Sequence, residues 1–366
     1  MGLPKHGRWL VVAALTALGV AVPFVRDTLP ASTGELDPQR LRDLVMRSAN
    51  VPHQGFAESS GRLPIPELPK LASVTSLLTG TTRIRTWYAA PSRERFDVVT
   101  ATGETDVYRT ADGELTYNSG DNRATELFGE VPVRLPRAGD LLPPELARRI
   151  LSAAPGDAIS SIPSQRVAGI SAAGLRLTPT DPDTTIGHVD IWADPTSGLP
   201  LRVELTAKNA AEPMLITQFR EVSLTPPADE VLRPNLAPDV GTGSVDSSDI
   251  EAALGRFGVV RPPARLAGRE LRMTDLAGIA VVYGTGLSSF VVLQLPRDVA
   301  NSALNAASNA GARTVGTGVH LEIPPLSLAV VRSTTGRRAY LLAGLVSPKV
   351  LEQAGAELAT LRRGPQ

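Results

Sequence analysis

The chain has 366 residues, which is enough for about two domains that each bury a core. Its 37 Lys and Arg balance its 37 Asp and Glu, so no net field attracts nucleic acid or an acidic membrane. The hydrophobic content of 42% is too low for a protein with many membrane spans. The absence of Cys excludes disulfides, thiolate metal sites and Cys nucleophiles.

The N-terminal segment has the layout of an export signal. Basic residues, Lys5 and Arg8 among them, precede an apolar run at residues 9–25. We interpret residues 1–27 as a signal peptide or an uncleaved membrane anchor, with a buried N-terminal helix as the alternative. Either form of export places the rest of the chain outside the cytoplasm, in a periplasm or at a cell surface, secreted or membrane-associated through the N-terminus.

Beyond this segment the hydrophobic period changes from helical to strand-like. Asp37 and Pro38 predict the start of an amphipathic helix that ends near Asn50, and a second helix is predicted at residues 143–153. Alternating apolar and polar residues predict strands in between and afterwards. These strands are expected at residues 82–89, 93–100, 104–110, 115–118, 165–170, 174–178, 186–193, 199–207 and 214–224. So many strands with one apolar face predict an open, strongly curved antiparallel sheet.

Three further segments complete the organisation. Residues 63–80 mix three Pro with apolar side chains, which suits an apolar lid over a cavity or a buried loop. Residues 234–248 are rich in Pro, Gly, Ser and Asp and are interpreted as a linker. Residues 249–362 then predict a compact α+β unit. Its helices are expected at 250–257, 299–309 and 348–361, and its strands at 266–273, 278–284, 290–295, 319–323, 326–333 and 338–345.

No arrangement of residues in the sequence indicates catalysis, a metal or a cofactor. His53, His188 and His320 are far apart and lack ligand spacing, and no nucleophile elbow, phosphate-binding loop or zinc-protease motif occurs. The acidic pair Asp181 and Asp183 lies on a predicted turn, and a second pair, at 104 and 106, lies on a strand face that we expect to be solvated. Basic side chains on neighbouring strands are interrupted by acidic ones, which argues against nucleic-acid binding.

The order of several segments resembles the LolA/LolB/RseB superfamily. RIRTWYAAPSRERFDVV and GETDVYRTADGELTYNS are followed by DPTSGLPLRVELTAKN, ITQFREVSL and PPADEVLRP, and the similarity covers residues 36–234. The later segments YGTGLSSFVVLQLP and LSLAVVRSTTGRRAYLLAGLVSP resemble the C-terminal domain of RseB-like proteins. The resemblance implies an α+β fold. A curved antiparallel half-barrel with covering helices would occupy residues 35–233, and a smaller α+β domain would occupy residues 249–362.

The resemblance also implies a ligand and partners. The half-barrel would hold an acyl lipid or lipoprotein in a hydrophobic cavity, and both domains would contact an anti-sigma factor. Candidate cavity residues are Phe56, Leu77, Leu78, Ile84, Tyr88, Phe96, Val98, Leu201, Val203, Leu205 and Phe219. The leading hypothesis is an extracytoplasmic, non-enzymatic sensor of envelope stress. The alternatives are a LolA-like carrier that works with a membrane transporter, and an anchored structural or accessory subunit without a ligand.

Overall fold

The structure is a computed structural model that describes residues 36–63, 72–100, 103–129, 136–248, 262–275, 280–335 and 338–361. The expected export segment at residues 1–27 and the expected helix at 250–257 lie outside these ranges, as does the part of the expected lid at 64–71. Across the described ranges, no helix combines the length and the apolar character needed to cross a bilayer.

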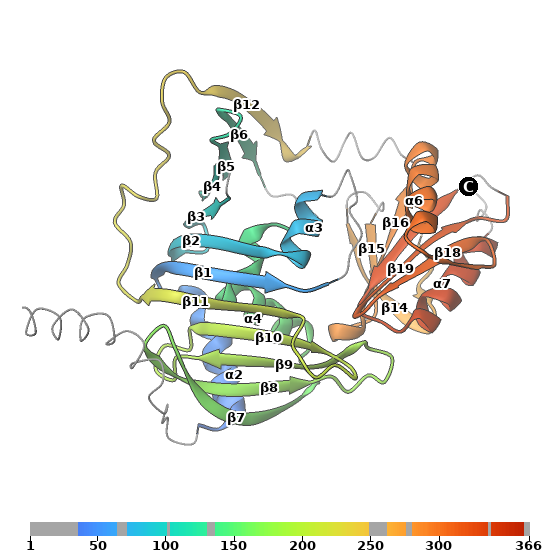
Figure 1. The fold of residues 1–366 in the computed structure, drawn as a ribbon, viewed down its shortest axis with the longest axis horizontal. Helices are drawn as coiled ribbons and strands as arrows, with labels where there is room; N and C mark the ends of the chain where they lie inside the picture. The colour runs from blue at the N-terminus through green and yellow to red at the C-terminus, as the bar shows by residue number, and fades with distance from the viewer. Residues whose placement is uncertain are drawn as a thin grey trace, which may run out of the picture.

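Twelve strands form one curved sheet (Figure 1), in the order β12-β6-β5-β4-β3-β2-β1-β11-β10-β9-β8-β7. Their bounds are β1 His53–Gly61, β2 Thr81–Ala90, β3 Arg93–Val99, β4 Glu104–Arg109, β5 Gly113–Asn118, β6 Arg123–Phe128, β7 Ala158–Val167, β8 Ile170–Thr178, β9 Ile186–Ala193, β10 Pro200–Ala207, β11 Leu215–Ser223 and β12 Gly241–Asp246. Two antiparallel meanders, β2 to β6 and β7 to β11, are joined through β1 at the centre. Short connections between consecutive strands produce such meanders.

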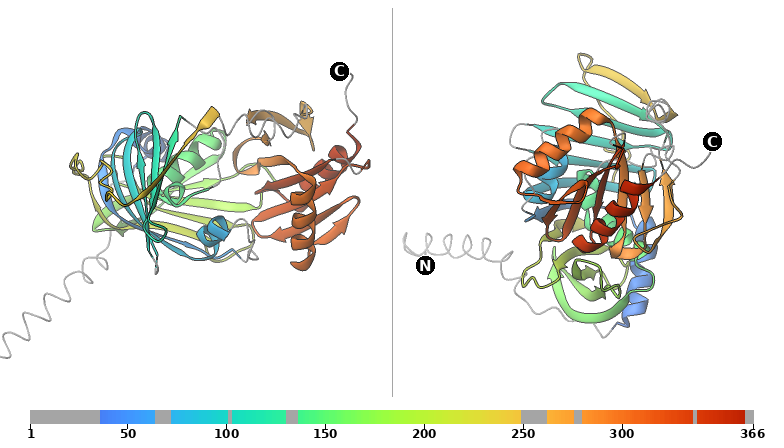
Figure 2. Two further views of the ribbon diagram at one scale, coloured as in Figure 1. Left: turned by 90° about the horizontal axis from the view of Figure 1, so that it is seen from above. Right: turned by 90° about the vertical axis from the view of Figure 1, so that its right-hand side faces the viewer.

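Helices cover the concave side of this sheet, which curves around α2 (Pro38–Arg47) and α4 (Pro143–Ala153) (Figures 1 and 2). Helix α2 begins as predicted at Asp37, whose carboxylate accepts a hydrogen bond from the Arg40 amide at 3.1 Å. The apolar sides of both helices pack on β8, β9 and β10. This helix-side cluster contains Leu41, Val45, Ala147, Ile150, Leu151, Ala154, Ala173, Leu175, Leu177, Ile186, Val189, Ile191, Ala193, Val203 and Leu287.

A second sheet of eight strands follows, in the order β13-β14-β15-β16-β20-β19-β18-β17. Its elements are β13 Arg265–Leu266, β14 Arg269–Asp275, β15 Ala280–Tyr283, η4 Gly286–Ser288, β16 Phe290–Leu295, α6 Arg297–Asn309, β17 Arg313–Val315, β18 Gly318–Ile323, β19 Leu326–Arg332, β20 Ala339–Gly344 and α7 Pro348–Thr360. Helix α7 lies close against β19. A Cβ at Gly355 would lie 2.8 Å from Cγ2 of Val331, so this approach requires glycine.

The predicted fold class, a curved antiparallel half-barrel with covering helices followed by a smaller α+β unit, is confirmed. Several details differ from the sequence-based expectation. Strands β1, β6 and β17 form where no strand was predicted. The strand predicted at 165–170 spans the turn between β7 and β8, where Ala168 and Gly169 adopt φ of +49° and +80°. The single strand predicted at 266–273 is the hairpin of β13 and β14, because Ala267 and Gly268 adopt φ of +48° and +73° and turn the chain. The segment 234–248, predicted to be a linker, contains β12.

Candidate functional site

The concave side of the large sheet carries an apolar cluster, here called the concave cluster. It joins strands from both meanders to the 3₁₀ helix η2 (Ala138–Leu141) and to α3 (Ala72–Thr79). Its buried members are Ala57, Leu77, Ile84, Phe96, Val107, Ala138, Leu141, Leu142, Val167, Ala172, Trp192, Leu199, Leu201, Leu215 and Phe219. The cluster therefore forms a continuous, packed apolar layer between the sheet and these two helices.

Most of the residues proposed for a cavity from the sequence lie together in or against this cluster. Those are Leu77, Ile84, Phe96, Leu201 and Phe219 within it, with Val98 and Leu205 packed against it. Tyr88 stacks on His53, whose ring meets Phe219 edge-on. Val203 instead belongs to the helix-side cluster, and Leu78 is half-buried on α3. Phe56 is also half-buried but lies opposite Arg85, so it occupies the other face of the sheet from Ile84.

Helix η2 closes one side of the concave cluster by close contact with the sheet. A Cβ at Gly139 would lie 2.8 Å from the Phe96 ring, so only glycine allows η2 to lie on that ring. The Thr217 hydroxyl of β11 donates to the Leu141 carbonyl at 2.6 Å and fixes the same helix. On another side, α3 contacts β1 and β2 and contributes Leu77, which is 8% exposed. Two elements thus enclose the concave cluster. Helix η2 is attached through a close contact and a hydrogen bond, whereas α3 is a single helix of eight residues.

A pocket opens where the concave cluster meets the protein surface. Phe96 and Leu142 belong to both, and the pocket has a volume of about 20 Å³, which is room for about one water molecule. The rest of its lining is mostly polar or charged and includes His53, Tyr88, Glu94, Arg109, Asp140, Glu145 and Arg148. The sequence pattern did not identify this rim pocket, because its charged residues come from distant helices and strands.

Burial sets the protonation of two groups in the rim pocket. It lowers the pKa of His53 to about 4, so this imidazole is neutral at physiological pH and its Nδ1 lies 2.9 Å from the Val51 carbonyl. It also raises the pKa of Glu94, against the opposing charge of Arg109, whose Nη1 lies 2.8 Å from the Glu94 carboxylate. The rim pocket therefore places paired charges beside the apolar Phe96 ring at the edge of the concave cluster.

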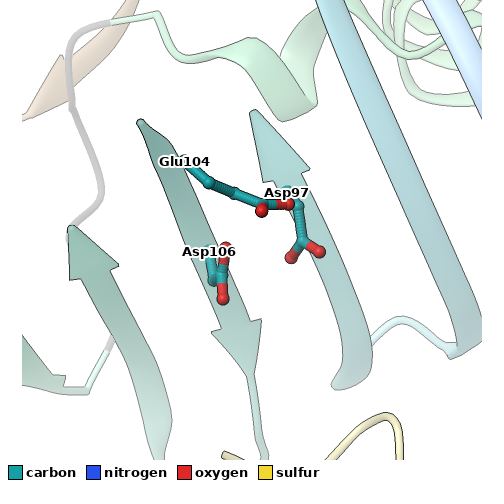
Figure 3. A group of neighbouring side chains, drawn as sticks. All are labelled: Asp97, Glu104 and Asp106. Atoms are coloured by element: carbon teal, nitrogen blue, oxygen red, sulfur yellow. The ribbon is translucent and has the colours of Figure 1, made fainter. Parts of the chain in front are cut away.

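The opposite, convex face of the sheet holds a group of three carboxylates (Figure 3). Asp97 on β3 and Glu104 and Asp106 on β4 have oxygen atoms within 4.8 Å of one another. Arg95 supplies the positive charge here, because it donates to both oxygens of Asp97 at 2.7 and 2.8 Å and to Asp106 at 3.2 Å. Burial raises the pKa of Asp97 to about 6, against the hydrogen bonds from Arg95. This donor set already pairs with a guanidinium and does not resemble a metal site.

The contact between the two sheets is another feature that the sequence pattern missed. Residues 181–185, predicted to be a plain turn, dock on the second sheet. The Thr184 hydroxyl lies 2.7 Å from the Leu287 carbonyl and 3.1 Å from that of Leu345, and Arg269 lies 3.2 Å from Asp181. The Leu287 side chain enters the helix-side cluster. The sequence could not predict this contact, because the Thr184 hydroxyl donates to backbone carbonyls and every residue has one.

Comparison with known proteins supports the fold. No protein-family model matches the sequence, and no curated protein matches it either. A chain in the complex structure of Pseudomonas aeruginosa MucA/MucB aligns over 87% of this chain and 97% of its own, at 16% identity and a TM-score of 0.51. A structure of MucB in complex with MucA(peri) aligns over 87% of this chain and 97% of its own, also at 16% identity, with a TM-score of 0.49. This chain therefore has the LolA/RseB-like fold that its sequence resembles.

Proposed function

We propose that this protein is a non-enzymatic, extracytoplasmic protein that binds an acyl lipid or lipoprotein on the concave side of its half-barrel. It would act as an RseB-like sensor that regulates an anti-sigma factor. The observation that carries the proposal is the concave cluster, which runs from α3 across the sheet to a rim pocket. An acyl chain of about 16 carbons gains up to roughly 13 kcal/mol at about 0.8 kcal/mol per buried CH₂, before ordering costs.

The arrangement of apolar and charged residues suits such a ligand. The acyl chain would lie against Ile84 and Phe219 after α3 moves away from the sheet, and the polar head group would lie in the rim pocket near Arg109 and Arg148. In the described structure α3 buries Leu77 in the place that the chain would take.

The second sheet favours a sensor over a carrier. The resemblance implies that plain carriers of this superfamily end after the half-barrel, whereas RseB-like members add a smaller domain. The structural neighbour is a chain of a complex of MucA and MucB, and its likeness extends over both parts of this chain. We therefore propose an anti-sigma factor as the partner of this chain, and domains at residues 35–233 and 249–362.

The test is native mass spectrometry of the protein after export by a bacterial host and purification without detergent. The expected result is added mass that extracts into chloroform as acyl lipid. Leu77→Asp places a charge in the concave cluster and should remove this mass. Ser76→Asp, on the exposed side of the same helix, should keep it.

A lipid-free mass for the wild-type protein, repeated after incubation with lipids and lipopeptides, would overturn the lipid proposal. Equal lipid content in a folded Leu77→Asp protein would overturn the assignment of the concave cluster. Circular dichroism identifies a variant that fails to fold. Genes beside this one separate the two functional classes, since a sigma and anti-sigma pair supports sensing and a transporter ATPase supports carriage.

A further inference from the structure

Strand β12 is attached to the large sheet differently from every other described strand. It runs parallel to β6, whereas the remaining strand pairs in the described ranges are antiparallel. The chain reaches it from β11, at the middle of the sheet, through residues 224–240, which follow the molecule around to the far edge (Figure 1). Strand β12 is therefore an edge strand supplied by a long crossing segment.

The side chains of β12 contribute little to holding it in place. All six are exposed or half-buried, two of them are Gly, and Val245 is 37% exposed. Glycine loses more conformational freedom than other residues when it joins a strand. Hydrogen bonds between the backbones of β12 and β6 are thus the main attachment, and they are balanced by the cost of ordering a glycine-rich segment.

Asn122 holds the beginning of β12. This residue lies at the turn between β5 and β6 with φ of +46°, and its side-chain amide donates to the Asp239 carbonyl at 3.2 Å. Its own carbonyl accepts from the Gly241 amide at 3.0 Å. Asn122 is therefore a small, exposed latch that sets where β12 begins to pair with β6.

We propose that β12 is a displaceable strap, and that the edge of β6 beneath it binds an extended peptide segment of a partner protein. The occupant seen on this edge specifies the chemistry of that partner. It would pair parallel to β6 over about six residues, carry mostly small side chains with a carboxylate at the end of the paired segment, and have an acceptor at the position of Asp239. The exposed Phe128, at the end of β6, would give an incoming segment an apolar contact that β12 leaves open. This inference is independent of lipid binding by the concave cluster.

A reversible disulfide tests the strap in the full-length protein. Ser244 and Glu126 are partners in the register of β12 and β6, and the chain contains no Cys, so the pair Ser244→Cys and Glu126→Cys would form a single defined bond. The probe is a fluorescein-labelled synthetic peptide of residues 239–248, and its binding is followed by fluorescence anisotropy. The control peptide carries Pro at the positions of Gly243 and Val245, whose amides, like that of Gly241, face β6, so this peptide lacks two of the donors that pair with the edge.

The reduced double variant is expected to bind the probe, and oxidation should weaken binding at least tenfold. Gly243→Pro combined with Val245→Pro in the chain removes two amide donors of the strap and leaves Asn122 and the edge of β6 intact, so this variant should bind the unmodified probe more tightly than the wild-type protein. Equal binding by the oxidised and reduced forms, equal binding of the Pro-containing peptide, or no binding to the strap variant would each overturn the proposal. Hydrogen exchange gives an independent reading: the amides of residues 241, 243 and 245, which face β6, should exchange at least tenfold faster than amides 113–118, and equal rates would also overturn the proposal.

Discussion

The guanidinium of Arg95 forms a two-pronged hydrogen bond with the carboxylate of Asp97, with distances of 2.7 and 2.8 Å. The same guanidinium lies between the rings of Trp87 and Tyr108, 4.9 and 4.8 Å from their centroids. Since these residues come from β2, β3 and β4, Arg95 connects three neighbouring strands on the convex face. The group of carboxylates around it is therefore a structural ion-pair network.

Asp97→Ala is expected to destabilise the protein by about 2 kcal/mol at neutral pH, because it leaves a largely buried guanidinium without its main partner. The matched control is Glu104→Ala in the same network. Glu104 is 34% exposed and pairs with Arg85, which is 50% exposed, so its loss should cost less than about 1 kcal/mol. Urea denaturation measures both. Equal losses would show that Arg95 does not depend on Asp97.

His53 should make the protein sensitive to acid. Burial lowers the pKa of this imidazole from 6.5 to about 4 in the folded protein. Between these two values the unfolded chain binds a proton that the folded protein does not. The contribution of His53 to the free energy of unfolding is therefore fully present above pH 6.5 and is lost as the pH falls to 4. The expected loss is about 3 kcal/mol. His53→Phe keeps the ring that stacks on Tyr88 and removes the titration. Denaturation midpoints measured across this range should fall less steeply for the variant, and parallel curves would contradict the assignment.

Two buried threonines on the concave face provide a matched pair. The Thr217 hydroxyl donates to the Leu141 carbonyl, whereas the Thr86 hydroxyl has no hydrogen-bond partner among the described residues. Thr86→Val should therefore stabilise the ligand-free protein by about 1 kcal/mol, and Thr217→Val should cost about 1–2 kcal/mol. Chemical denaturation measures both changes. A loss of stability in Thr86→Val would mean that its hydroxyl finds a partner in solution.

The sequence predicts those strands whose two faces differ strongly in polarity. In β10, Leu201 and Val203 are fully buried as the alternation requires, while Arg202 on the other face is half-buried. Strand β1 was missed because its buried face carries small or polar residues such as Ala57 and Ser59, which give no apolar period. Its central place between β2 and β11 results from the pairing of distant segments, and local patterns do not encode that pairing.

The same limit applies to the candidate site. Ile84 and Tyr88 were correctly placed on one face, because period-2 alternation fixes the face of a strand residue. Phe56 was not, since β1 itself was unrecognised. The rim pocket combines Glu94 of β3 with Arg148 of α4, and these come together only when the helices fold back on the sheet. Likewise, the role of Arg95 depends on cross-strand register, which no short motif in the chain specifies.

The last prediction concerns the docking of the two sheets. Thr184 is 2% exposed, and its hydroxyl lies within hydrogen-bond distance of two carbonyls of the second sheet region. Thr184→Val leaves both carbonyls without this donor and the Ile186 amide without its acceptor. We expect a cost of about 1–2 kcal/mol to docking. The readout is hydrogen exchange at the Ser347 amide, which donates to the Asp183 carbonyl at 2.6 Å and should lose protection. Thr180→Val is the control, because the hydroxyl of Thr180, the residue just before this turn, bonds within the first sheet region, to Asp157. If this turn docks the two sheets, only Thr184→Val should accelerate exchange at the Ser347 amide. Equal protection of that amide in both variants would contradict the docking role of the turn.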